Sequence, residues 1–334
     1  MSKHLEGLQG RPTWLSYLGA VHGCLDWLGV DVSDAWLSGG TGHAFFMHMV
    51  PNADPGGPIG WDGLCVSKCG DRTDHGAVID LQTNVGFRTE SVCRCPHGRR
   101  ADEVDEDSAK EAAWRFVRDN IDRGVPCIGY ELAYPEFFTI AGYDDTGYYY
   151  FEPGPGMTPG TIKGPAPWQS VSPDVHWVRF SSVEAHPPAP DDVVVRQALS
   201  RITERTLHPQ APDWGTIGPA AYEVWAKALD DGTAQGFGHR YCTATWTELR
   251  RNAVAFLREA KERLPGRADD LFDDALAHYQ VVAAKLRALH ELHPFMDPCE
   301  DTLQSHEAAA LIREAGAAET LGLPVLARIA EALG

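Results

Sequence analysis

The chain has 334 residues, of which 43% are hydrophobic and 23% are charged, and this composition excludes a largely disordered protein. Its 29 Lys and Arg against 47 Asp and Glu give a formal net charge of −18, a sign that repels phosphate backbones and anionic lipid headgroups. We therefore expect neither nucleic acid nor a membrane as a partner, although the same charge also serves solubility. The length predicts one large or two medium domains.

The first residues carry no pattern of a secretion signal. Residues 1–14 contain no apolar run before a small-residue cleavage site, and no stretch approaches the roughly 20 apolar residues that span a bilayer. Eight cysteines are too few for a disulfide scaffold in a chain of this length. We expect a cytoplasmic protein with reduced cysteines.

The composition changes between residues 184 and 192. Residues 1–185 are rich in Gly, Pro and aromatic residues, whereas residues 192–334 are rich in Ala, Leu, Glu and Arg with a 3.6-residue apolar period. The intervening segment holds three prolines, which deny the backbone its helical hydrogen bonds. The sequence predicts two domains, 1–185 and 192–334.

In the first domain, an apolar stripe predicts a helix over residues 14–28 that ends at Gly29. Gly19 and Gly23 either weaken this helix or allow another backbone to approach it closely. A second helix is expected over 107–122, with acidic residues at its start. Short β-rich runs follow at 125–130, 137–141 and 148–151, the last two joined by a turn-forming segment. The pattern predicts an α+β domain with an antiparallel sheet.

In the second domain, apolar stripes predict helices over 245–264 and 269–292, and a last helical region over 305–333 that breaks near 322–324. Residues 236–241 are expected to form a loop between helices that covers a cleft at the domain junction, or else to pack in the core. These stripes are typical of an all-α helical bundle domain.

One stretch carries a resemblance to a known group. Residues 135–153 contain Gly142-Tyr-Asp-Asp-Thr-Gly147 between two aromatic runs and end at Glu152-Pro153. This stretch resembles the strand–hairpin–strand signature of papain-like, bacteriocin-processing bacterial peptidases and of the related butirosin-biosynthesis acyltransferase. Residues 16–45, a helix followed by a Gly-rich segment running into Ala44-Phe45, are also similar to that group. The resemblance implies a papain-like domain.

The resemblance breaks at the residues that perform the chemistry. In the group, a Cys begins the helix, a His opens the strand, and the Asp of an Asp-Pro pair orients that His. Here Ser16 occupies the Cys position, Glu136 occupies the His position and Glu152 replaces the Asp. A Ser flanked by two carboxylates cannot perform Cys–His chemistry, because its hydroxyl needs a base whose pKa lies near the working pH. The pKa of Glu starts at about 4.3, so burial or a second carboxylate would have to raise it.

These replacements lead to a functional hypothesis. We expect a non-peptidase member of this acyl-handling group, a biosynthetic enzyme of transferase or cyclase type. It would act on a small amine- or peptide-bearing substrate in the cleft between domains, without a cofactor or metal. Glu136 would be the acid/base, Glu152 and Tyr130 would position it, and Ser16 would hydrogen-bond to the substrate. Further substrate contacts are assigned to Cys24, Trp27, Tyr143, His239 and Tyr241.

Two alternatives stay open. The first is a catalytically inactive protein that keeps the groove to bind a small molecule or peptide. The second is an acyltransferase that uses Cys24 as the nucleophile, although this thiol lies about 12 Å along the helix from Ser16, away from the helix N-terminus.

A zinc site is a further possibility that the sequence leaves undecided. Five residues offer soft or borderline ligands, but their spacing differs from the usual two-residue gaps, so scattered reduced cysteines are the alternative. The five are Cys65, Cys69, Cys93, Cys95 and His97. The sequence contains no P-loop, dinucleotide-binding glycine pattern or Gly-x-Ser-x-Gly motif, and it leaves the oligomeric state open.

Overall fold

The computed structural model describes residues 2–49, 81–94, 105–155, 160–174, 177–207, 216–295 and 302–334. Its contacts divide the chain into two compact units: unit 1 comprises Met1–Val32 and Cys65–Pro188, and unit 2 comprises Ser33–Leu64 and Ala189–Gly334. The sequence predicted a continuous first domain over 1–185, whereas the contacts assign 33–64 to unit 2. The reason is visible in helix α2 (Asp34–Gly40), where Gly39 lies directly against the ring of Phe256 in that unit.

Unit 1 is built on an antiparallel sheet with the strand order β3-β8-β4-β5-β6-β7, and β1 also pairs with β5. The strands are β1 (Lys3–His4), β3 (Phe87–Arg94), β4 (Cys127–Tyr130), β5 (Phe137–Tyr143), β6 (Gly147–Phe151), β7 (Lys163–Pro167) and β8 (Val178–Ala185). Short 3-10 turns, η2 (Thr83–Val85) and η3 (Trp168–Ser170), precede β3 and follow β7. The mixed α+β class and the β5–β6 hairpin agree with the sequence prediction.

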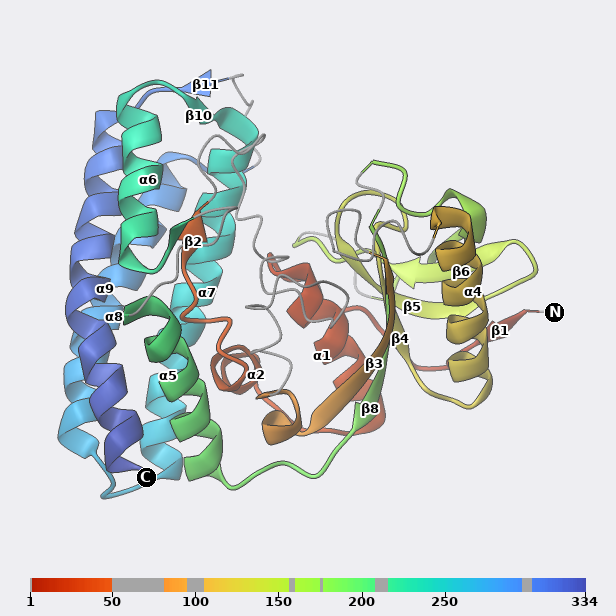
Figure 1. The fold of residues 1–334 in the computed structure, drawn as a ribbon, viewed down its shortest axis with the longest axis horizontal. Helices are drawn as coiled ribbons and strands as arrows, with labels where there is room; N and C mark the ends of the chain where they lie inside the picture. The colour runs from red at the N-terminus through yellow and green to blue at the C-terminus, as the bar shows by residue number, and fades with distance from the viewer. Residues whose placement is uncertain are drawn as a thin grey trace. The chain divides into compact units, whose positions relative to one another are not determined.

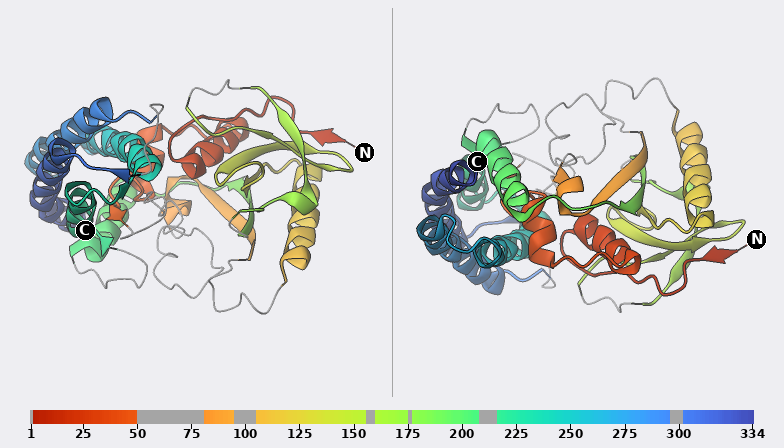
Figure 2. Two further views of the ribbon diagram at one scale, coloured as in Figure 1. Left: turned by 90° about the horizontal axis from the view of Figure 1, so that it is seen from above. Right: turned by 90° about the horizontal axis from the view of Figure 1, so that it is seen from below.

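Two helices cover opposite faces of this sheet. Helix α1 (Ser16–Leu28) lies on the face to which Phe137 and Thr139 point, since Thr139 donates to the carbonyl of Ala20 at 3.3 Å. Helix α4 (Glu106–Asp122) packs on the other face, where Phe138 and Ile140 join its apolar side chains in one core. Successive residues of a strand point to opposite faces, so β5 serves both cores. Figures 1 and 2 show the sheet between the two helices.

The segment before α1 runs close along this helix. A Cβ on Gly19 would lie 2.3 Å from the carbonyl oxygen of Arg11, and one on Gly23 would lie 2.5 Å from that of Gln9. Of the two alternatives raised for these glycines, close approach of another backbone is therefore the correct one. The helix ends at Gly29, which has a left-handed φ of 72°, as expected.

Unit 2 is mainly helical (Figure 1). Beside α2, it contains α5 (Asp191–Leu207), α6 (Pro219–Asp230), α7 (Gly236–Arg263), α8 (Asp269–Leu292) and α9 (His306–Ala332). Two short antiparallel pairs join β2 (His48–Met49) to β9 (Thr216–Ile217) and β10 (Ala234–Gln235) to β11 (Thr302–Leu303). Among the described helices of both units, none is long and apolar enough to cross a membrane.

Two expectations for unit 2 are wrong. Residues 236–241 are not a loop, because α7 begins at Gly236, and the side chain of His239 is held there by Trp225 of α6. The last helix does not break near 322–324, because α9 continues through Pro324, and Gly322 leaves room for Tyr279 of α8. In both places, contacts between helices override the tendency of Gly and Pro to interrupt a helix.

Candidate functional site

Ser16 and Glu136, assigned from the sequence to one site, are in contact in the structure. Ser16 is the first residue of α1, and its side chain is 4% exposed. Its hydroxyl donates a hydrogen bond to Oε2 of Glu136 and accepts one from the backbone N–H of Phe137 at 3.1 Å. The positive end of the α1 dipole therefore lies beside a carboxylate, an arrangement that favours negative charge.

Glu136 is held by the loop that precedes β5. Its backbone N–H donates to the carbonyl of Tyr134 at 2.7 Å, and its carbonyl accepts from the N–H of Glu131 at 2.8 Å. The side chain is half-buried. Glu136 thus stands directly before the first residue of β5, with its backbone N–H and carbonyl both hydrogen-bonded.

Glu152 reaches the same neighbourhood from β6. Because Thr139 pairs with Phe151 across the β5–β6 hairpin, Glu152 follows β6 at the end where β5 begins. The backbone N–H of Thr13, three residues before Ser16, donates to the carbonyl of Pro153 at 2.9 Å. The Glu152 carboxylate forms an ion pair of 3.6 Å with Lys163 of β7.

Tyr134 lies close enough to both acids for their charges to act on its phenol, and it was not among the residues predicted from the sequence. Burial raises the pKa of its phenol, and the carboxylates of Glu152 and Glu136 and the phenol of Tyr150 raise it further. Its ring packs edge-on against Phe138 at 5.0 Å. The phenol therefore stays protonated beside both acids and can donate a hydrogen bond. The only signal in the sequence was its position two residues before Glu136.

Tyr130, which the sequence analysis placed beside Glu136, packs underneath the site. Its ring lies 4.9 Å from the ring of Phe137 and 4.9 Å from that of Trp177, and the residue is buried. Tyr130 thus packs against Phe137, whose backbone N–H donates to Ser16. The ring of Tyr130 contacts Phe137 and Trp177.

Arg179 is a second residue that the sequence did not single out. Its side chain, on β8, is buried, and its guanidinium lies 5.1 Å from the ring of Phe137, 5.3 Å from Trp177 and 5.8 Å from Tyr17. Aromatic faces attract a cation most strongly where water is excluded. The positive charge of Arg179 is therefore buried on the face of the sheet that α1 covers. It lies beside Tyr17, which follows Ser16, and Phe137, which follows Glu136. A lone Arg within an apolar strand, Val178-Arg-Phe180, was the available signal.

Three other predicted contacts in unit 1 lie elsewhere. Cys24 is fully buried, and burial, with a smaller contribution from Cys127, raises the pKa of its thiol well above the usual value. Trp27 donates to the carbonyl of Glu6 at 2.9 Å. Tyr143 lies at the far end of β5, about 20 Å along the strand from Phe137, and donates to Asp122 at 2.7 Å.

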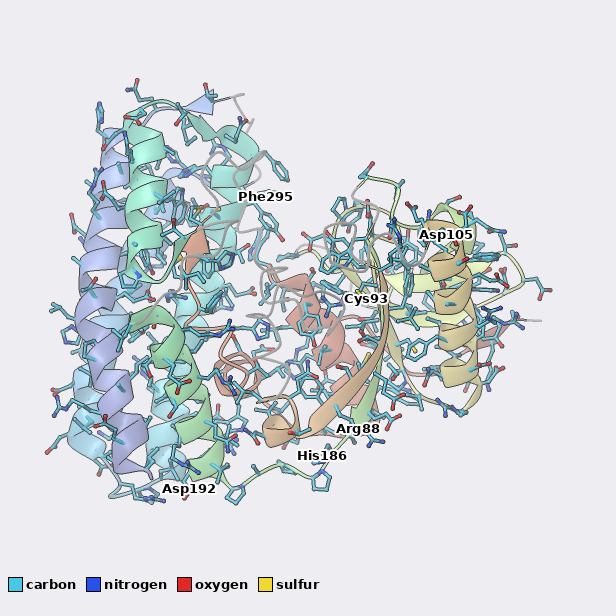
Figure 3. The ribbon with its side chains drawn as sticks, in the orientation of Figure 1. Arg88, Cys93, Asp105, His186, Asp192 and Phe295 are labelled. Carbon is cyan, nitrogen blue, oxygen red and sulfur yellow. The ribbon has the colours of Figure 1, made fainter. Side chains whose placement is uncertain are left out.

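His239 and Tyr241 belong to unit 2, where contacts within that unit hold both. Nδ1 of His239 accepts from the Trp225 indole N–H at 3.0 Å, and its Nε2 lies 2.8 Å from Nδ1 of His293. Burial, together with the neighbouring His293 and Arg240, lowers the pKa of His239 to about 3. Tyr241 stacks on Phe237 and packs against Phe295, which is labelled in Figure 3.

The possible zinc ligands lie almost entirely outside the described residues, which include only Cys93 of the five. Cys93, on β3 (Figure 3), is disulfide-bonded, contrary to the expectation of reduced cysteines, whereas Cys24, Cys127 and Cys242 carry free thiols. Within the described ranges, no three His, Cys, Asp or Glu side chains are grouped so that they could hold a metal ion. The disulfide leaves Cys93 without the thiolate that zinc would need, and the possibility of zinc at the other four residues falls outside the described ranges.

The described site thus combines a carboxylate bonded to a hydroxyl at a helix N-terminus with a second carboxylate and a protonated phenol. Such a set can take up and release a proton, and can stabilise negative charge that develops on a substrate. No protein-family model matches the sequence, and no curated protein matches it significantly.

Proposed function

We propose that this chain is a non-peptidase member of the papain-like, acyl-handling group that its β5–β6 hairpin resembles. It is a biosynthetic enzyme that joins an acyl group to a small amine- or peptide-bearing substrate, with Glu136 as the acid/base. The observation that carries this proposal is the hydrogen bond between Ser16 and Glu136 at the start of α1. An α-helix that begins against the first residues of an antiparallel strand supports the papain-like assignment.

The proposed step is an acyl transfer that needs no covalent enzyme intermediate. The substrate amine forms a bond to the carbonyl carbon of an ester or thioester, and the bond from that carbon to the leaving oxygen or sulfur breaks. Glu136 removes the proton that the amine loses and returns it to the leaving group, so protons balance. The phenol of Tyr134, which burial keeps protonated, is available to donate to the developing oxyanion.

Ser16 orients Glu136 in this proposal and does not attack the substrate. Its oxygen already accepts from Phe137 N–H, its proton is directed to Glu136, and it is 4% exposed. The alternative of nucleophilic attack by Cys24 is disfavoured because burial raises the pKa of this thiol and so suppresses the reactive thiolate.

One observation favours a different function, a binding protein without turnover. The Ser16 hydroxyl both donates and accepts a hydrogen bond within the protein. This is expected where the residue at the nucleophile position has only a structural role. In that case, Glu136 would only bind the amine as its counter-ion. The two functions differ in whether a bound amine is consumed.

The test compares the wild-type protein with Glu136→Gln, which keeps the size of the side chain and a hydrogen-bond acceptor. Glu90→Gln, an exposed acid on β3, is the matched control. Each protein is incubated with a panel of acyl thioesters and esters and of small amines and dipeptides, and amide formation is followed by mass spectrometry. We expect wild-type and Glu90→Gln to form amide at equal rates, and Glu136→Gln to be slower by about 10²–10⁴-fold. Amines that bind to wild-type protein by calorimetry but are never acylated would favour the binding protein.

A further inference from the structure

Glu131 is a buried acid to which the proposed mechanism assigns no role. It follows the last residue of β4 and is 0% exposed. Its backbone has a left-handed φ of 54°, a conformation that Gly, Asn and Asp adopt far more readily than Glu. Residues held in such conformations persist where the surrounding structure fixes them, and they concentrate at functional sites. Both the complete burial of this acid and its backbone conformation therefore call for an explanation.

Hydrogen bonds of Glu131 close the loop that carries Glu136 and tie this loop to another part of unit 1. Its N–H donates to the carbonyl of Glu136 at 2.8 Å and closes the loop 131–136. Its carbonyl accepts from Ser172 N–H at 3.0 Å, and its Oε1 accepts from Asp174 N–H at 2.8 Å. The loop is therefore anchored by one bond within itself and by two bonds to the turn before β8.

The other side of this anchor is equally constrained. Ser172 is also fully buried with a left-handed φ of 57°, and its hydroxyl donates to the carbonyl of Trp177 at 3.0 Å. From Trp177 the chain enters β8 and places the Arg179 guanidinium over the ring of Phe137. The same turn thus contacts the loop of Glu136 through Glu131 and leads to the residues that support Phe137.

We propose that Glu131 is a positioning residue whose carboxylate, through its bond to the Asp174 N–H, holds Glu136 against the Ser16 hydroxyl. It touches no substrate and acts through the backbone of residues 131–136. The inference deepens the proposed function, because it matters for catalysis only if Glu136 is the acid/base. The placement of Glu136 that it describes can be measured without turnover.

Two substitutions separate the reach of this side chain from its charge. Glu131→Asp keeps the charge and suits the left-handed backbone better, but it is one methylene too short to reach the Asp174 N–H. Glu131→Gln loses the charge and keeps an oxygen at the same distance. If position matters, only Glu131→Asp disturbs the site. Glu90→Asp on the exposed face of β3 controls for the loss of a methylene.

The readout is the titration of the Glu136 carboxyl group, followed by ¹³C NMR on protein labelled at the glutamate carboxyl carbon. The Glu136 signal is the one that Glu136→Gln removes. We expect Glu131→Asp to move its titration midpoint by about 0.5 pH unit or more, and Glu131→Gln and Glu90→Asp to leave it unchanged. Hydrogen exchange of the Phe137 amide, bonded to Ser16, should accelerate about tenfold or more in Glu131→Asp alone as this bond opens.

The opposite pattern, a shift in Glu131→Gln with none in Glu131→Asp, would overturn the inference and assign the effect to charge. An unchanged midpoint in both variants would also overturn it. Neither result depends on the acyl-transfer assay, so a protein without turnover can still confirm or refute the positioning role. Conversely, if Glu136→Gln leaves turnover intact, the proposed function fails while the NMR result stands.

Discussion

A buried ion pair in unit 2 gives a prediction about stability. Arg250 of α7 and Glu319 of α9 are both 0% exposed and form two hydrogen bonds, each of 2.8 Å. Arg250 also donates to the carbonyl of Ala44 at 2.8 Å, and Tyr222 of α6 donates to Glu319. The pair thus connects two long helices to a third helix and to the segment after α2.

We expect Glu319→Gln to lower the free energy of unfolding of unit 2 by about 3–5 kcal/mol. Removal of one partner leaves the Arg250 guanidinium buried without a counter-charge, and mutational studies of such pairs give losses of about this size. Glu223→Gln is the control, because Glu223 pairs with Arg313 between α6 and α9 at the surface. Exposed pairs contribute about 0–1 kcal/mol.

The assay is urea denaturation followed by tryptophan fluorescence and far-UV circular dichroism, with the midpoint and slope fitted for each variant. The double substitution Arg250→Met with Glu319→Leu should recover part of the loss, because it removes both charges. It should not recover all of it, since the Ala44 carbonyl then lacks its donor. A loss below about 1 kcal/mol in Glu319→Gln, equal to that of Glu223→Gln, would refute the reasoning.

Three further predictions concern other parts of the fold. Iodoacetamide at neutral pH should modify Cys24 in the folded protein no faster than the unfolding rate allows, because burial raises the pKa of this thiol; rapid labelling detected by mass spectrometry would contradict this. Burial lowers the pKa values of His43 and His239 to about 3, so below pH 6.5 the unfolded chain takes up protons that the folded protein does not. The free energy of unfolding should therefore fall by about 1.4 kcal/mol per pH unit for each histidine between pH 6.5 and 3, and His239→Gln should reduce this slope in urea titrations at several pH values. Gly19→Ala should displace the backbone of Arg11 and lower the melting temperature, and an unchanged melting temperature would contradict the close approach of the two backbones.

Elements defined by local chemistry were predictable from the sequence. Helix α4 lies one residue from its predicted start, because Asp105 accepts from the Ser108 N–H and acidic residues occupy the first turn. The β5–β6 turn was also predictable, since Asp144 accepts from the N–H groups of Thr146 and Gly147. These signals lie within a few residues of the structure they specify.

What depended on distant contacts was not predictable. The start of α7 at Gly236 depends on contacts such as that between His239 and Trp225, and the assignment of α2 to unit 2 depends on its packing against α7. At the site, Ser16 and Glu136 were predictable because they stand at the positions where the resembled group has its Cys and His. Tyr134, in the loop before β5, and Arg179, on β8, were missed because their roles follow from the direction of their side chains in the folded unit.

The central claim is that Glu136 moves a proton in the reaction, and the most direct measurement is the rate of amide formation by Glu136→Gln at saturating substrate. The account predicts a loss of about 10²–10⁴-fold with an unchanged far-UV circular dichroism spectrum. A rate equal to that of wild-type protein, from a folded variant, would contradict it.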